Sequence, residues 1–117
     1  MGQFYYVDVR LKVLDDKAFI AATKKLLADE NVSADSLKKF DDTSVLGCVR
    51  FMLAAEFQGQ FRSEEVEDGF IECSNDFHAT YSWSTLLWKW WGGIFPYIEC
   101  KSSMHVQEDE GSWTVEK

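Results

Sequence analysis

The sequence predicts an α+β fold of two layers, in which helices pack on one face of a small, mostly antiparallel sheet. Two observations lead to this prediction. Residues 5–13 alternate between apolar and polar side chains, which is typical of a half-buried strand. Three later segments repeat their apolar residues at the spacing of an amphipathic helix. The expected order along the chain is β-α-(α)-α-β-α-β-β, within a single domain of residues 1–117.

The N-terminal third is predicted to form a strand, a helix and a short helical turn. The apolar side of the strand consists of Tyr5, Val7, Val9, Leu11 and Val13. Asp15 stands at an N-cap position before a helix that should end near residues 29–31, since a carboxylate oxygen there can accept a free N–H of the first turn. The inner stripe of this helix consists of Phe19, Ile20, Thr23, Leu26 and Leu27. Residues 33–40 are expected to form the turn.

The second full helix is predicted to follow this turn. Asp42 or Thr43 can cap it, and its inner stripe consists of Val45, Val49, Met52 and Leu53. Gly59 marks its expected end, because glycine is the commonest residue just beyond a helix. Residues 58–68 carry a run of acidic side chains and are predicted to form an exposed acidic loop.

The second half is predicted to contain a strand, a tryptophan-rich helix and a hairpin. The strand covers residues 69–77, with Ile71 and Cys73 facing inward and Glu72 and Ser74 facing outward. The hairpin places Met104 and Val106 beside Trp113 and Val115, with residues 108–111 as its turn.

The tryptophan-rich helix is predicted to start at Trp83, with Ser82 as its cap. The dipeptide Gly92-Gly93 costs about 2 kcal/mol of helix propensity, and Pro96 removes a helical hydrogen bond. We therefore favour a break at the glycines over the alternative, in which they allow another backbone to approach closely.

The same helix has an unusually wide apolar surface. One stripe consists of Trp83, Leu86, Leu87, Trp90, Ile94 and Tyr97, and a second consists of Trp88, Trp91 and Phe95. Together they cover about 200° of the helix circumference, at 100° per residue. Two interpretations of the second stripe remain open. It packs under residues 43–56 or 57–69, or it forms an exposed aromatic patch for a protein partner or a second copy of the chain.

The net charge of −8 comes entirely from residues 56–117. The acidic side chains gather in two clusters, Glu64, Glu65, Glu67 and Asp68, and Glu108, Asp109 and Glu110. The clusters are either solvated loops or an electrostatic face that attracts a basic partner. Direct binding of DNA or RNA is not expected, because it needs an excess of lysine and arginine. A surface that imitates nucleic acid and occupies a basic groove agrees with this charge.

No catalytic, metal or cofactor site is predicted. His78 and His105 have no second histidine or cysteine at ligand spacing, and the pair Cys73 and His78 is adjacent only in sequence. Glu72 and Asp76 are expected to be solvent-facing carboxylates. The three cysteines, Cys48, Cys73 and Cys100, are an odd number at wide spacing, which indicates reduced thiols in the cytoplasm and small side chains packed among apolar neighbours. The sequence shows no secretory signal and no apolar run long enough for a membrane span.

Residues 77–83, Phe-His-Ala-Thr-Tyr-Ser-Trp, resemble a pattern found in small uncharacterised proteins of gut bacteria, phages and mobile elements. In those proteins a similar segment opens a helix that ends at a proline, followed by a hairpin with a final Gly-x-Trp strand. Pro96 and residues 111–113 occupy comparable places here, and the resemblance covers about 40 residues. Some small acidic proteins from these sources are anti-CRISPR inhibitors and others are immunity proteins against nuclease toxins. The resemblance therefore implies an inhibitor, and it transfers no catalytic residue.

The sequence thus leads to the hypothesis of a non-enzymatic inhibitor of the anti-CRISPR type, which binds a nucleic-acid-handling protein through an acidic surface anchored by tryptophan. The expected binding residues are Trp88, Trp91, Phe95, Glu64, Glu65, Glu67, Asp68, Glu108, Asp109 and Glu110. The alternatives are a homo-oligomeric interaction module, including a homodimer, an immunity protein, and a small enzyme or ligand-binding domain whose aromatic side chains line a pocket.

Overall fold

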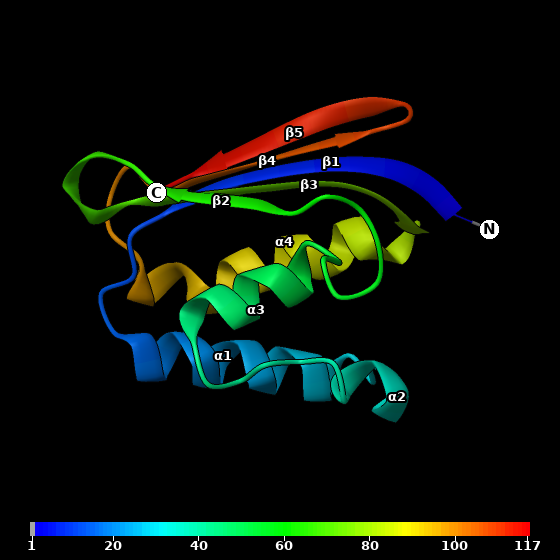
Figure 1. The fold of residues 1–117 in the computed structure, drawn as a ribbon, viewed down its shortest axis with the longest axis horizontal. Helices are drawn as coiled ribbons and strands as arrows, with labels where there is room; N and C mark the ends of the chain where they lie inside the picture. Colours follow the sequence, from blue (N-terminus) through cyan, green and yellow to red (C-terminus); the bar gives the residue numbers. More distant parts are fainter. Residues whose placement is uncertain (1) are drawn as a thin grey trace.

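The computed structural model describes residues 2–117 as a five-stranded antiparallel sheet with all helices on one face (Figure 1). The elements are β1 (Gly2–Leu11), α1 (Asp16–Asp29), α2 (Ala34–Leu37), α3 (Val45–Met52), β2 (Arg62–Glu65), the 3₁₀ turn η1 (Glu67–Gly69), β3 (Ile71–Thr80), α4 (Ser82–Ile94), the 3₁₀ turn η2 (Phe95–Tyr97), β4 (Ser103–Glu108) and β5 (Gly111–Glu116). The predicted α+β class and the order of elements are confirmed. The short strand β2 is an addition that the sequence did not reveal.

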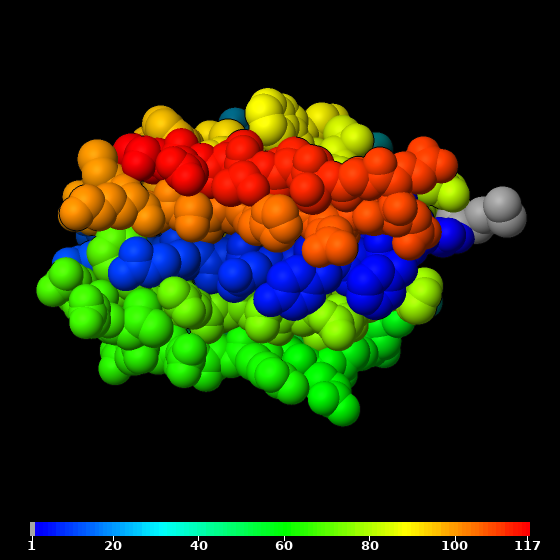
Figure 2. Space-filling view, turned by 90° about the horizontal axis from the view of Figure 1, so that it is seen from above, coloured from blue at the N-terminus to red at the C-terminus, as the bar shows by residue number. Residues whose placement is uncertain are grey.

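The N-terminal strand β1 lies at the centre of the sheet, whose order is β2-β3-β1-β4-β5. Tyr5 is opposite Phe77 of β3 on one side and opposite Glu108 of β4 on the other. The alternation seen in the sequence places the apolar side of β1 against the helices, where Tyr5, Val7, Val9 and Leu11 are fully buried. The other face of the sheet is uncovered (Figure 2). Most of its side chains are polar, as is usual for an antiparallel sheet packed on one side.

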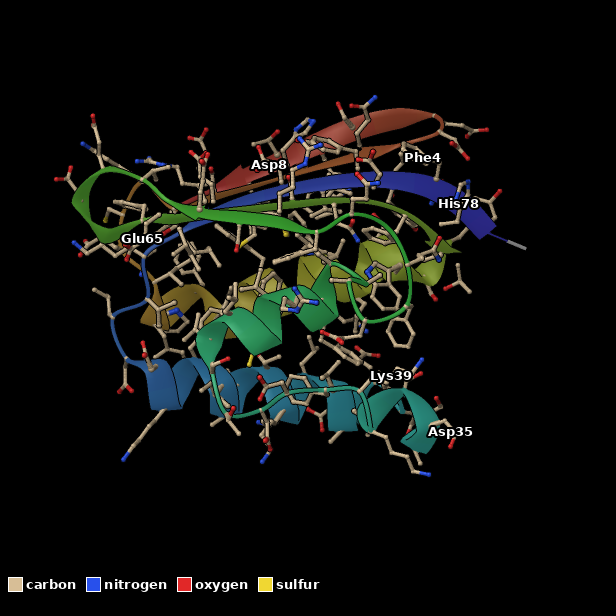
Figure 3. The ribbon with its side chains drawn as sticks, viewed as in Figure 1. Phe4, Asp8, Asp35, Lys39, Glu65 and His78 are labelled. Atoms are coloured by element: carbon tan, nitrogen blue, oxygen red, sulfur yellow. The ribbon has the colours of Figure 1, made fainter. Side chains whose placement is uncertain are left out.

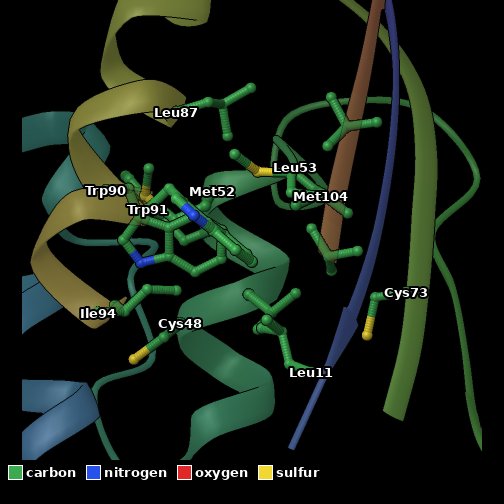
Figure 4. Packing of buried hydrophobic residues seen from close by; sticks show 14 of the residues in the cluster. Leu11, Cys48, Met52, Leu53, Cys73, Leu87, Trp90, Trp91, Ile94 and Met104 are labelled. Carbon is green, nitrogen blue, oxygen red and sulfur yellow. The ribbon is translucent and has the colours of Figure 1, made fainter. Parts of the chain in front are cut away.

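The helices are stacked in two tiers beneath the sheet (Figure 1). Helices α3 and α4 lie directly under the strands, and α1 lies under both of them. Trp90 of α4 faces α1, because its ring packs edge-on against Phe19 at 6.0 Å and its Nε1–H donates to Thr23 Oγ1 at 3.0 Å. Trp91 belongs to the same continuous core as Met104 of β4 (Figure 4). The wide apolar arc of α4 therefore reflects a helix that is covered on two sides.

The sequence placed the boundaries of α3 incorrectly. Its N-cap is Ser44, whose Oγ accepts the N–H of Gly47 at 2.9 Å, and neither Asp42 nor Thr43 has this role. Asp42 forms an ion pair with Lys24 of α1 instead. Gly59 does not end the helix, which stops at Met52.

Helix α4 also departs from the prediction at both ends. Its N-cap residue is Tyr81, which makes no side-chain capping bond, and the Ser82 hydroxyl pairs with that of Thr80 at 2.8 Å. The helix does not break at Gly92-Gly93 but continues to Ile94, where the turn containing Pro96 takes over. Burial of Trp90, Trp91 and Ile94 outweighs the cost of two glycines, since each large apolar side chain contributes about 1.5–3 kcal/mol when buried.

The segment predicted as an exposed acidic loop contains β2, whose four residues are all exposed at one edge of the sheet. Two side-chain amides attach the preceding loop to β3. Asn75 Nδ2 donates to the carbonyls of Leu53 and Gln58 at 2.8 and 3.1 Å. Gln58 in turn pairs its amide with the backbone of His78, donating to the carbonyl at 2.6 Å and accepting the N–H at 3.1 Å. The Gln58 amide thus occupies part of the β3 edge that β2 does not cover.

Candidate protein-binding surface

A pair of tryptophans, the exposed Trp88 and the half-buried Trp113, joins α4 to the edge strand β5. Trp88 is 59% exposed and packs edge-on against Trp113, with ring centroids 5.6 Å apart. Trp113 is itself held in place, because its Nε1–H donates to Ser84 Oγ at 3.1 Å. The two rings line a shallow cleft of about 230 Å³ together with Ser84 and Thr85. Because Trp88 is exposed and already held against Trp113, it offers a large contact area at little cost in side-chain entropy.

Two more exposed aromatic side chains lie along α4 and its end. Tyr81, Trp88 and Phe95 are spaced seven residues apart, which places them close to one side of the helix. Tyr81 is 60% exposed and Phe95 40% exposed. Lys117 covers the Phe95 ring with its ammonium group 4.8 Å from the centroid and donates to the Phe95 carbonyl at 2.7 Å. Of the two interpretations that the sequence left open, exposure of the second stripe therefore holds for Trp88 and Phe95.

Trp91 does not belong to this surface. It is 6% exposed and packs in the core, so the expectation that it would anchor a partner is wrong. The physical reason is that Trp91 packs in the core that α4 shares with Met104 of β4, whereas its neighbour Trp90 faces α1. The interpretation in which the second stripe packs under residues 43–56 or 57–69 is wrong for Trp88 and Phe95, which are both exposed.

The acidic turn between β4 and β5, residues 108–110, lies at one end of the same edge. Asp109 and Glu110 are exposed, and Glu108 is half-buried opposite Tyr5. Asp109 Oδ2 accepts the backbone N–H of Phe4 at 3.3 Å, which ties the turn to the start of β1. Trp113 follows this turn by only three residues in β5. The tryptophan pair and the acidic turn therefore form one continuous stretch of edge.

The second acidic cluster, residues 64–68, lies at the opposite end of the sheet. Glu65 is opposite Ile71, which is itself opposite Leu11 of β1, whereas Glu108 is opposite Tyr5. Six residues of β1 separate these positions, or about 20 Å along the strand. Figure 3 shows Glu65 far from Phe4 and His78, which mark the other end. The structure therefore brings only the turn 108–110 next to the tryptophan pair, and residues 64–68 lie at the other end of the sheet.

The uncovered face of the sheet carries acidic side chains of its own. A depression of about 370 Å³ contains Asp8, Glu64, Glu72 and Arg62. Burial raises the pKa of Asp8, with the nearby Glu72 carboxylate adding to the effect and His105 opposing it. Glu72 faces outward as predicted and lies 3.6 Å from Arg10 Nε. This pairing offsets the repulsion expected from Glu64, which lies directly opposite Glu72 on β2.

The residue pairs considered for catalysis are not brought together. Cys73 faces the core and His78 faces solvent on the opposite side of β3, so no hydrogen bond between them is possible. Burial raises the pKa of the Cys73 and Cys48 thiols to about 12, which keeps them protonated and unreactive. Cys100 departs from the expected packing among apolar neighbours, because it is exposed.

Each of the two histidines contacts a side chain of a neighbouring strand. His78 packs edge-on against Phe4 at 5.5 Å, and His105 Nδ1 is hydrogen-bonded to Thr114 Oγ1 at 2.7 Å across β4 and β5. Within residues 2–117 no three histidine, cysteine, aspartate or glutamate side chains are arranged to hold a metal ion.

In the same residues 2–117 no helix is both long and apolar enough to cross a membrane. No protein-family model, curated protein sequence or solved structure matches the chain.

Two residues of the surface were missed in the sequence. Trp113 was assigned only to the inner side of the hairpin, and its contact with Trp88 depends on β5 lying next to α4. Tyr81 was not singled out, although it lies one heptad before Trp88. The seven-residue spacing from Tyr81 through Trp88 to Phe95 was the available signal for an aromatic row.

Proposed function

We propose that this protein is a non-enzymatic binding protein that inhibits a nucleic-acid-handling protein, of which a CRISPR effector nuclease is the specific form. The observation that carries the proposal is the exposed Trp88, held against Trp113 beside the acidic turn 108–110. Large aromatic side chains dominate the binding energy of many interfaces, and acidic groups beside them steer a basic partner.

The charge of the chain supports a basic partner. The chain has 20 acidic and 12 basic residues. Each of the five ion pairs within residues 2–117 joins one acidic and one basic side chain, so the acidic excess remains. This excess repels a phosphate backbone and attracts the grooves that bind one. Such a target also places the protein in the cytoplasm, which agrees with the absence of disulfides between its three free cysteines.

The test is inhibition of DNA cleavage by a panel of purified CRISPR effector nucleases at low and high salt. We expect inhibition that weakens as salt rises, because exposed charges more than about 10 Å apart are screened at 0.1 M salt. Trp88→Ala should weaken inhibition at least about tenfold, as for a typical hot-spot residue. Reversing the turn with Glu108→Lys, Asp109→Lys and Glu110→Lys should abolish it.

The matched control reverses the distant cluster with Glu64→Lys, Glu65→Lys, Glu67→Lys and Asp68→Lys. This control changes the net charge by more than the turn variant does, but at the other end of the sheet. Equal loss of inhibition in both variants would mean that total charge, rather than the tryptophan-containing edge, determines binding. Inhibition that survives Trp88→Ala would contradict the proposed anchor.

Self-association through the same aromatic surface is the second candidate, favoured by the exposure of both Trp88 and Phe95. Sedimentation velocity over a wide range of protein concentration separates the two. A mass that doubles with concentration and returns to the monomer in Trp88→Ala would assign the surface to a homodimer.

A further inference from the structure

We propose that the partner docks by adding an extended segment to the free edge of β5, antiparallel to it, with apolar residues on the Trp88–Trp113 cleft and basic residues beside the acidic turn 108–110. This inference rests on the proposed function and specifies how its surface works. In this mode of docking, the backbone of β5 and the side chains that flank it make the main contacts with the partner.

The first observation is that β5 has an unoccupied hydrogen-bonding edge. Within residues 2–117 its only strand neighbour is β4. Lys117 N–H donates to the carbonyl of Ser102 at 2.9 Å, in the same register that pairs Ser103 with Glu116. Hydrogen-bonded positions alternate along an antiparallel pair, so Val115 and Trp113 bond to β4. The N–H and C=O groups of Ser112, Thr114 and Glu116 therefore point away from the sheet.

The second observation is the contrast between the two edges of the sheet. Edge strand β2 has four residues, of which Arg62, Glu64 and Glu65 are charged, and the Gln58 amide covers part of the β3 edge beyond it. Short length and charged side chains are common ways to prevent a further strand from pairing. Edge strand β5 has six residues and a single charged side chain, Glu116. The β2 edge is thus protected against pairing with a further strand, and the β5 edge is not.

The third observation is that side chains of α4 extend beyond β5. Figure 2, seen from above the uncovered face, shows atoms of α4 beyond the outer margin of the β5 strand. Trp88 lies on this helix and reaches Trp113 on the inner side of β5. An added strand would therefore have alternate side chains over the two tryptophans and the others beside Thr114, on the polar face.

Charge complementarity identifies the added strand as a basic segment of another protein. β5 runs away from the acidic turn, so an antiparallel segment ends beside Asp109 and Glu110. Lysine or arginine at the C-terminal end of the segment would meet these carboxylates. A second copy of the chain would bring a further net charge of −8 to the same place. The basic segment is therefore the better occupant, since like charges across an interface are unfavourable.

The test is an mRNA-display selection of random dodecapeptides against the full chain, followed by binding measurements with the most enriched peptide. We expect enriched peptides to alternate apolar and polar residues and to end in lysine or arginine. N-methylation of alternate amides, which removes the donors but keeps the side chains, should weaken binding at least about tenfold, the effect of losing 1.4 kcal/mol.

The protein variants locate the binding site. Thr114→Pro removes an N–H that points away from β4, and Trp88→Ala removes the floor of the cleft, so each should weaken binding at least about tenfold. Glu64→Lys with Glu65→Lys, on the other edge strand, is the control and should change binding less than about twofold, apart from salt-dependent effects. The circular dichroism spectrum shows whether Thr114→Pro folds, and the N-methylated peptide tests the same hydrogen bonds in the wild-type chain.

Each outcome bears on one of the two proposals. If basic peptides are enriched but their binding changes neither on N-methylation nor in Thr114→Pro, strand addition is overturned and the proposal of a basic partner stands. Enriched peptides without basic residues would overturn the proposed function as well. Binding that is lost only in the control Glu64→Lys, Glu65→Lys would move the site to the opposite edge. Enrichment of nothing, together with a concentration-dependent dimer, would assign the β5 edge to a second copy.

Discussion

The Tyr5 hydroxyl accepts the backbone N–H of Ser84 at 3.3 Å, so a residue of the central strand caps the first turn of α4. The same hydroxyl donates to the Thr80 carbonyl at 2.8 Å and accepts from the Gln3 side chain at 2.8 Å. Tyr81, at the N-cap position, makes no such bond with its side chain. One phenol group therefore fixes the end of β3, the start of α4 and their position on β1.

Tyr5→Phe should lower the free energy of unfolding by about 1–3 kcal/mol, because it leaves buried polar groups without their partner. Chemical denaturation of both proteins measures the difference. Tyr6→Phe is the control, since Tyr6 lies on the uncovered face and should change stability by less than about 0.5 kcal/mol. An equal effect of the two substitutions would contradict the capping role of Tyr5.

Trp91→Ala should destabilise the protein by about 3–5 kcal/mol, because it leaves a cavity in the core between α4 and its neighbours. Trp88→Ala should cost less than about 1 kcal/mol, since its ring is mostly in solvent. Urea denaturation compares the stabilities of the two variants. A large loss of stability for Trp88→Ala would mean that its contact with Trp113 supports the fold rather than binding.

Gly92→Ala and Gly93→Ala should each stabilise the protein by about 0.5–1 kcal/mol, because alanine has the higher helix propensity. Apart from the adjacent residues and the backbone of the helix itself, no atom lies within 4 Å of the added methyl group at either position. Gly59→Ala is the opposite case. Gly59 has φ +91°, and a methyl group there would collide with the Asn75 amide and the Asp76 carbonyl. Thermal unfolding should show higher midpoints for the first two variants and a lower one for Gly59→Ala.

Asp8→Asn should increase stability at neutral pH. The folded state raises the pKa of Asp8 above its ordinary value of 3.8, so the folded protein binds the proton more tightly than the unfolded chain. Ionisation of Asp8 therefore reduces stability as the pH rises from 3.8 through the raised pKa. The advantage of Asp8→Asn should be present at pH 7 and vanish below pH 3.8 in urea denaturation experiments. Asp76→Asn, on the same face, controls for the removal of one negative charge.

The elements that were predicted correctly are those with a strong local pattern. Alternation from Tyr5 to Leu11 identified β1, and the same pattern with a glycine turn identified the last hairpin. The four residues of β2 have no apolar alternation, so nothing local distinguished them from a loop. The predicted cap of α3 was one or two residues too early, because Asp42, Thr43 and Ser44 are all suitable cap residues.

The candidate site was only partly predictable for a different reason. The exposure of Trp88 and the burial of Trp91 depend on which sides of α4 are covered by the sheet and by α1. The Trp88–Trp113 contact depends on the order of strands, which places β5 at the edge. Both are relations between distant segments, and helical periodicity carries no information about them.

The central position of β1 has a consequence for how the chain folds during synthesis. Strand β1 is synthesised before both of its neighbours and pairs with segments about 70 and 100 residues later, so most contacts in the sheet are long-range. Folding of such topologies is slow, because large loops must close before the contacts that reward them form. Until β4 has been synthesised, the edge of β1 that pairs with β4 stays free, and the apolar side chains from Tyr5 to Leu11 are only partly covered. A nascent chain that stalls before the last hairpin would therefore expose an aggregation-prone strand edge and depend on chaperones.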